Sequence, residues 1–297
     1  TLFAPLVSLI GAIAVSAVLL FVKRCAVTYA ISGVLIAGAL VASLVCMGIY
    51  YESGEAADMN GTTNDEVESV ALYISAAVAI VAVLAATFLT GKGDKKGFDT
   101  KAISYAAVCI AMSFALSYLR IVKMPQGGSI TIASLVPLMI YSYMFGTRKG
   151  VFAGFIYGIL QAFQDPYILH PAQFLLDYPL AFMCIGLAGC FAKVKALDKA
   201  PQVQIALGGV VAGLSRFVMH FLSGMFAFGM WAPEGQPVWL YSLTYQAGYV
   251  LPDIAIAIVA AAILFSSRAF VRQVRRFNTA KPAAQPAAQE QAVPPQA

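Results

Sequence analysis

Nine runs of apolar residues, each close to the length of a membrane-spanning helix, dominate this sequence. About 20 residues of α-helix cross the roughly 30 Å of hydrocarbon in a bilayer. Helices suit such runs because they pair every backbone polar group internally. The sequence therefore predicts an all-α polytopic membrane protein of about nine transmembrane helices in the cell membrane. The predicted spans are 2–22, 25–51, 69–90, 102–122, 129–146, 150–164, 173–192, 204–229 and 241–266.

Composition supports a membrane protein and argues against several other classes. Hydrophobic residues make up 60% of the chain, charged residues 11%, and the mean hydropathy is +0.80, which is too apolar for a soluble domain. The nucleotide-binding pattern GxxxxGK[ST] and the catalytic patterns HExxH and GxSxG are absent, and there are two histidines. We therefore predict that the chain is not an enzyme and has no cofactor, no metal site and no nucleic-acid partner. Energy for any transport must come from a partner or an ion gradient.

Basic residues gather in alternate connections between the predicted helices. Sixteen of the 19 lysines and arginines fall in the connections that follow the first, third, fifth and seventh spans or in the segment after the ninth. The connection 52–68 instead has six acidic residues and no basic one. Since basic loops mark the cytoplasmic side, the N-terminus is predicted to lie outside and the C-terminus inside.

The chain divides into four parts on composition. Residues 1–91 form a three-helix N-terminal membrane extension without visible chemistry, and 92–101 a basic cytoplasmic linker. Residues 102–267 form a six-helix domain, and 268–297 a tail that is basic and then rich in Pro, Ala and Gln. The part of the tail after Arg276 is predicted to be disordered.

Ionisable residues lie inside each of the last three predicted spans. Arg216, His220 and Gly224 are spaced four apart, so they share one face of a helix, and Asp177 lies in the apolar run before it. A charge within a span costs about 2.5–3.5 kcal/mol on insertion scales and by default marks a site or pathway. For Asp177 three interpretations remain open: an ion pair with Arg216, a ligand-binding acid, or a proton relay.

Three other ionisable residues have alternatives of their own. Asp253 follows Pro252, where a kink or freed backbone carbonyl is expected, and a structural role is favoured for it. Structural pairing is likewise favoured for Arg216, while His220 is interpreted as facing a ligand, with a packing histidine as the alternative.

Polar and aromatic residues collect near the predicted outer connections 120–128, 165–172 and 230–240. They are Gln126, His170, Asp177, His220, Trp231, Glu234, Trp239 and Tyr241. Tryptophan and tyrosine at helix ends are typical of an interfacial belt. Aromatic rings beside a carboxylate also suit a flat cationic heterocycle, whose charge they attract. We therefore predict a small-ligand site that opens to the outside.

Four segments carry a family resemblance: MPQGGSITI at 124–132, HPAQFLLDYPLAF at 170–182, RFVMHFLSGMFAFG at 216–229 and APEGQPVWLYSLTYQAGY at 232–249. With these segments, residues 102 to about 266 resemble the thiamine-binding substrate-capture subunit (S component, ThiT family) of energy-coupling-factor (ECF) vitamin transporters. The resemblance implies a six-helix S-component bundle that captures thiamine at the outer face of a bacterial plasma membrane. It also implies partners, namely a membrane scaffold subunit and two cytoplasmic ATPase subunits of an ABC-type transporter.

The resemblance also implies which residues contact the ligand. Carried over by position, these are Asp177, Tyr178, Arg216, His220, Gly224 and Tyr241; we add Phe228, Gln246 and Gln126 from the same segments. Some family members have Glu at Asp177 and Trp at Phe228, and the family usually has Asn at Gln246. The small-residue ladder Ala107, Ala111 and Ala115 corresponds to the family's scaffold-docking helix.

Two other functions remain open on the sequence. The chain could be an ion-coupled secondary transporter for a small cationic or heterocyclic solute, with Asp177, His220 and Asp253 as relay residues. It could also be an S component for a thiamine precursor. No internal repeat is visible, which counts against the secondary transporter.

Overall fold

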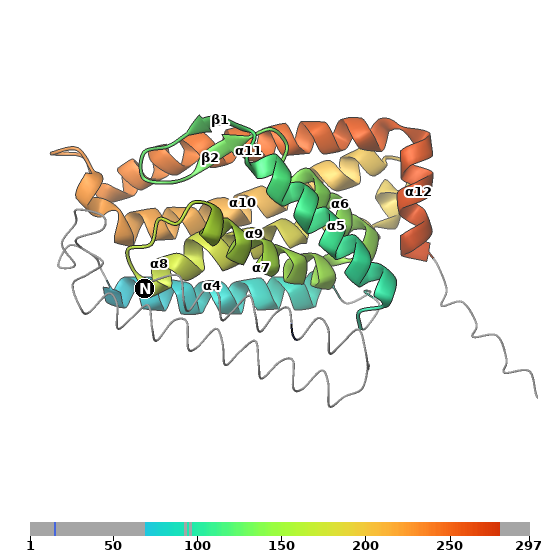
Figure 1. The fold of residues 1–297 in the computed structure, drawn as a ribbon, viewed down its shortest axis with the longest axis horizontal. Helices are drawn as coiled ribbons and strands as arrows, with labels where there is room; N and C mark the ends of the chain where they lie inside the picture. Colours follow the sequence, from blue (N-terminus) through green and yellow to red (C-terminus); the bar gives the residue numbers. More distant parts are fainter. Residues whose placement is uncertain (1–14, 16–68, 92–93, 95–96, 280–297) are drawn as a thin grey trace, which may run out of the picture.

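The structure, a computed structural model, describes residues 15, 69–91, 94 and 97–279 of the chain. Apart from residue 15, the predicted helices 2–22 and 25–51, the acidic connection 52–68 and the tail after 279 lie outside the described residues. Most of the described elements are helices that run lengthwise in one bundle (Figure 1). In chain order the elements are α4 (Ser69–Thr90), α5 (Thr100–Ser117), β1 (Arg120–Lys123), β2 (Ser129–Thr131), α6 (Val136–Phe145), α7 (Thr147–Gln164), α8 (Pro171–Leu175), η2 (Leu176–Leu180), α9 (Ala181–Ile185), η3 (Gly186–Gly189), η4 (Lys195–Leu197), α10 (Pro201–Ala227), η5 (Gly229–Trp231), α11 (Val238–Ser266) and α12 (Arg268–Thr279).

Five described helical segments are long and apolar enough to cross a membrane. They are Val70–Thr90, Thr100–Ser117, Pro171–Gly189, Pro201–Ala227 and Val238–Ser266. Each overlaps a predicted span, so the prediction of a mostly helical, polytopic membrane chain is confirmed. The count of nine helices and the orientation of the termini stay predictions.

A β-hairpin replaces part of two predicted helices. The predicted span 102–122 ends at Ser117, and the span 129–146 begins with a strand instead of a helix. The two strands pair antiparallel, with Val122 opposite Ile130. The turn between them contains Gly127 and Gly128 at φ +86° and +87°, a backbone region that favours glycine. This predicted helix start was wrong because hydropathy alone does not separate a short apolar strand from a helix.

Helix α12 was not predicted, because its segment was assigned to the tail. The helix is amphipathic: Val271 and Val274 are buried, and Arg268, Arg272 and Arg276 are exposed. It packs on α6 and α11 and crosses one end of the bundle in Figure 1. The basic residues predicted to form a charged tail are therefore the outer face of a helix up to residue 279.

Helix α4, the third helix of the predicted N-terminal extension, packs against the six-helix part. Its buried stripe is Leu72, Ala76, Ala79 and Val83, and it contacts α7, α8, η2 and α10. Near one end the Tyr73 ring meets the His170 ring edge-on at 4.8 Å between centroids. Near the other, the Arg148 guanidinium lies 5.8 Å from the centre of the Phe88 ring. The described part of the extension is thus fixed to the domain at both ends.

Candidate ligand-binding site

The segment that carries Asp177 is a helix interrupted at its centre. Between α8 and α9 the backbone forms one π-helical turn, Leu176–Leu180, with Pro179 inside it. Proline has no backbone N–H and cannot continue the regular ladder, and single π-turns are frequent at functional sites. The predicted single helix 173–192 is therefore a composite of three helix types that ends at Gly189.

A cavity lies between the hairpin turn, this π-turn, α10 and α11. All nine predicted ligand residues line it: Gln126, Asp177, Tyr178, Arg216, His220, Gly224, Phe228, Tyr241 and Gln246. Other side chains in the lining are Arg120, Gln161, Asp165, Tyr167, Gln173, Phe182, Ser242, Tyr245 and Tyr249. The structure brings the predicted residues together, and their contact with a ligand stays a prediction.

Asp177 is held by three hydrogen-bond donors from its own segment and from α10. Its Oδ2 accepts from Gln173 Nε2 and from Ser223 Oγ, both at 2.6 Å. Its Oδ1 lies 2.9 Å from His220 Nδ1, which donates to the carboxylate. Among the described ion pairs Asp177 has no arginine or lysine partner. This leaves a partly enclosed carboxylate, 15% exposed, that faces the cavity without a strong counter-charge.

Arg216 pairs with Asp253, which excludes the ion pair with Asp177, one of the three interpretations left open for that acid. Arg216 Nη1 lies 2.8 Å from Asp253 Oδ2, and both side chains are buried. Asp253 Oδ1 also accepts from the backbone N–H of Thr131 at 2.9 Å and from its hydroxyl at 2.7 Å. The guanidinium lies 4.9 Å from the centre of the Phe182 ring. Asp253 thus ties α10, α11 and the hairpin together, in keeping with the structural role favoured for it.

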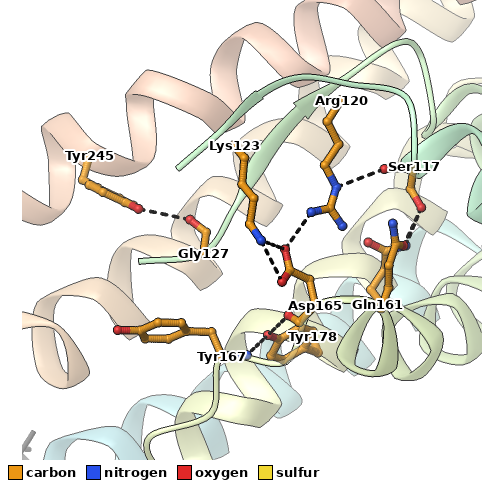
Figure 2. Close-up of polar contacts among 10 residues, drawn as sticks. Ser117, Arg120, Lys123, Gly127, Gln161, Asp165, Tyr167, Tyr178 and Tyr245 are labelled. Atoms are coloured by element: carbon orange, nitrogen blue, oxygen red, sulfur yellow. Dashed lines mark hydrogen bonds and ion pairs between the residues drawn. The ribbon is translucent and has the colours of Figure 1, made fainter. Parts of the chain in front are cut away.

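A second acid, Asp165, holds the hairpin at the edge of the cavity, as Figure 2 shows. Its carboxylate lies 2.7 Å from Arg120 Nη1 and 3.1 Å from Lys123 Nζ. Tyr178 donates its hydroxyl to the Asp165 backbone carbonyl at 2.9 Å and accepts from Tyr167 N–H at 2.8 Å. Sequence reasoning missed Asp165, although the connections 120–128 and 165–172, which contain Asp165 and its two basic partners, were both predicted on the outer side.

Aromatic rings form much of the remaining wall. The Tyr167 ring stacks on Phe228 with centroids 5.7 Å apart, and Trp231 tilts against Phe228 at 5.5 Å. Tyr245 Oη donates to the Gly127 carbonyl at 3.1 Å (Figure 2). It also accepts from Gln126 N–H at 2.9 Å, and the two bonds fix the hairpin turn. Trp239, by contrast, is 53% exposed and does not line the cavity, as expected for an interfacial belt.

Three buried polar atoms of the lining lack a hydrogen-bond partner within the described residues. They are Arg216 Nε, His220 Nε2 and Gln246 Oε1. Buried polar groups are almost always paired, and an exception calls for an explanation such as an absent ligand or water. One donor and two groups that can accept are therefore available to a molecule in the cavity.

His170 caps the segment that leads to Asp177, and we predict a pH effect from it. Its Nδ1 accepts from Ala172 N–H at 3.1 Å, and burial lowers its pKa from 6.5 to about 4. Because the folded pKa lies below the unfolded one, the stabilisation is complete above pH 6.5 and is lost as the pH falls towards 4. The melting temperature in detergent should fall over that window. In His170→Asn, which keeps a capping acceptor without the titration, the fall should be smaller; an equal fall would exclude His170 as its cause.

Comparison with known proteins places the chain in a family. The family whose model matches residues 103–272 is described as thiamine transporter protein (Thia_YuaJ). Thiamine transporter ThiT of Bacillus subtilis (strain 168) is 38% identical over 150 residues, which cover 48% of this chain and 78% of that protein. The protein of the same name from Lacticaseibacillus paracasei is 29% identical over 174 residues, which cover 54% of this chain and 84% of that protein.

A solved structure supports the fold. The crystal structure of ThiT from Listeria monocytogenes superposes with a TM-score of 0.51 at 23% identity, over 57% of this chain and 94% of that one. The residues matched by the family model, 103–272, include those that line the cavity. With five apolar helices of spanning length, this is a multi-pass cell-membrane protein. On residues 103–272, the chain belongs to the thiamine transporter protein family (Thia_YuaJ).

Proposed function

We propose that the cavity binds thiamine and that the chain captures it at the outer face of the membrane. Thiamine combines a permanently positive thiazolium ring with a flat aminopyrimidine. The observation that carries the proposal is Asp177, a cavity carboxylate held by Gln173, Ser223 and His220 without an arginine or lysine. A bound cation supplies the counter-charge that a carboxylate at this depth requires.

The other cavity residues suit the two rings of thiamine. Phe228, stacked on Tyr167, and Tyr241 offer aromatic faces to flat rings. His220 Nε2 and Gln246 Oε1 are unpartnered and can accept from the aminopyrimidine. Tyr178 and Gln126 contribute from the π-turn and the hairpin turn, and Gly224 leaves room between α10 and α11. No covalent step is assigned to these residues.

The test of binding is isothermal titration of the detergent-purified protein with thiamine, riboflavin and hydroxymethylpyrimidine. Trp231 contacts Phe228 in the cavity wall, so its fluorescence gives a second readout. Saturable binding of thiamine with about one ligand per chain is expected. Hydroxymethylpyrimidine should bind more weakly, and riboflavin should not bind. Tighter binding of the pyrimidine would make the chain a precursor carrier, and no binding by folded protein would overturn the proposal.

We further propose that the chain works as the S component of an ECF-type ABC transporter, with a membrane scaffold and two ATPase subunits as partners. The chain has no nucleotide-binding motif of its own. Ala107, Ala111 and Ala115 form an exposed small-residue ladder on α5, a face that another helix can approach closely. Asp253, a relay residue in the alternative of ion-coupled transport, is engaged by Arg216 and Thr131. This favours the partnered mechanism.

The docking face gives a prediction about uptake. Ala111→Leu should lower thiamine uptake about tenfold in cells that also express the scaffold and ATPase subunits, because overpacking a close contact costs about 1–3 kcal/mol. Thiamine affinity of the purified subunit should not change. Val259→Leu, at a 58% exposed position of α11 and away from the ladder, is the matched control. Full uptake without the ATPases, abolished by a proton or sodium ionophore, would instead establish a secondary transporter.

A further inference from the structure

The charged residues of the cavity are divided into separate groups. The described lining contains two arginines, Arg120 and Arg216, and two acids, Asp165 and Asp177, in addition to His220. Arg120 is paired with Asp165 at 2.7 Å. Arg216 is paired with Asp253, which lies behind the cavity wall and does not line it. Each cavity arginine thus has a carboxylate of its own, and neither is bonded to Asp177.

The Arg216–Asp253 ion pair is buried and is held in place by further contacts. Asp253 is 3% exposed and Arg216 is 5% exposed, so both charges have left water. Thr131 donates twice to Oδ1 of Asp253, which leaves Oδ2 directed at Arg216 Nη1. On its other side the guanidinium meets the Phe182 ring. A buried pair of this kind holds its geometry only when further hydrogen bonds satisfy the carboxylate, as they do here.

Arg216 is nevertheless close to the groups that hold Asp177. On α10 it lies one turn from His220, which bonds Asp177 directly. An arginine freed from Asp253 would place an unbalanced positive charge in the cavity wall. It would either bond Asp177 in place of a ligand or repel a cation that approaches Asp177.

We propose that Asp253 is a specificity-determining positioning residue: it neutralises and restrains Arg216, so that Asp177 keeps its negative charge for a cationic ligand. This inference rests on the proposed function and adds to it. Asp253 does not touch the ligand and acts through Arg216. Loss of Asp253 should therefore change how strongly the site prefers a charged ligand to a neutral one. General damage to the fold would weaken both ligands alike.

The experiment compares thiamine with its neutral 3-deaza isostere, in which carbon replaces the quaternary nitrogen. The measured quantity is the ratio of their dissociation constants by titration of the full-length protein. In Asp253→Asn the preference for thiamine should fall about tenfold or more, because like charges placed close together in a buried site cost at least the 1.4 kcal/mol that corresponds to tenfold. Equal weakening of both ligands, with the ratio unchanged, would overturn the proposal.

Two further variants keep the test decisive. The double variant Arg216→Gln with Asp253→Asn removes both charges of the pair and keeps hydrogen-bonding side chains, so its ratio should return to within about threefold of the parent ratio. The single variant Arg216→Gln removes a positive charge instead of a negative one, so it should leave the preference for thiamine unchanged or raise it. It tests the same role even where Asp253→Asn does not fold, because a lowered ratio in Arg216→Gln would overturn the proposal.

The result for the parent protein distinguishes a failure of this inference from a failure of the proposed function. Failure of the parent to bind thiamine would remove the proposed function itself. A parent that prefers thiamine to the isostere, with a ratio insensitive to Asp253→Asn, would remove only the role of Asp253.

Discussion

Asp177→Asn is expected to weaken thiamine binding by about 2–5 kcal/mol, the range found when one partner of a buried, hydrogen-bonded charge pair is lost. The amide keeps the size of the side chain and removes the charge that would face the thiazolium. Its oxygen can still accept from Ser223 and Gln173, which bond the same carboxylate oxygen, but its NH2 group then replaces the oxygen that accepts from His220 Nδ1. Isothermal titration measures the loss.

Two variants control this result. Asp198→Asn removes an exposed acid in the connection between η4 and α10, outside the cavity lining, and should leave affinity unchanged. Asp177→Glu keeps the charge with one more methylene and should retain more affinity than Asp177→Asn. Equal affinity of Asp177→Asn and the parent would remove Asp177 from the site.

Gly224→Leu is expected to lower thiamine affinity about tenfold to a hundredfold. A Cβ at Gly224 would lie 2.8 Å from Gln246 Nε2 and closer still to Ser242 Oγ, so α10 and α11 must separate or their side chains must turn. Such overpacking costs about 1–3 kcal/mol, and both displaced side chains line the cavity. Titration with thiamine measures the affinity, and a thermal shift measures the stability.

The matched control for Gly224→Leu lies on the same helix. Val218 is 46% exposed, so Val218→Leu adds volume where no neighbour is displaced. Wild-type affinity in Gly224→Leu would mean that the close approach of α10 and α11 is not needed for the site.

The sequence predicts those parts of the fold that depend on local chemistry. A run of apolar residues is a property of consecutive residues, so α4 begins and ends where hydropathy places it, at Ser69 and Thr90. The hairpin is missed because its strands have only four and three residues, too few for a visible alternation, and its existence depends on a turn that contains two glycines. Helix α12 is missed because its few apolar residues gain stability only from packing on α6 and α11.

The same distinction applies to the site. The family resemblance of four segments, together with the residue types in them, was enough to choose nine positions that line one cavity. The partner of Arg216 was not predictable, because Asp177 and Asp253 are both intramembrane acids and only the packing of three elements decides between them. Asp165 is paired across 45 residues with Arg120, a long-range contact that leaves no local signal.

The π-turn at Leu176–Leu180 also changes the phase of the helix that contains it. A π-turn holds one residue more than an α-turn, and each residue advances an α-helix by about 100°. The inward faces before and after Asp177 are therefore offset by about that angle relative to a continuous α-helix. Deleting a single residue within the turn would restore regular periodicity and rotate the chain on one side of it by the same angle. Asp177 and the buried Cys184 could then no longer both face inward, so the segment tolerates substitution far better than a change of length.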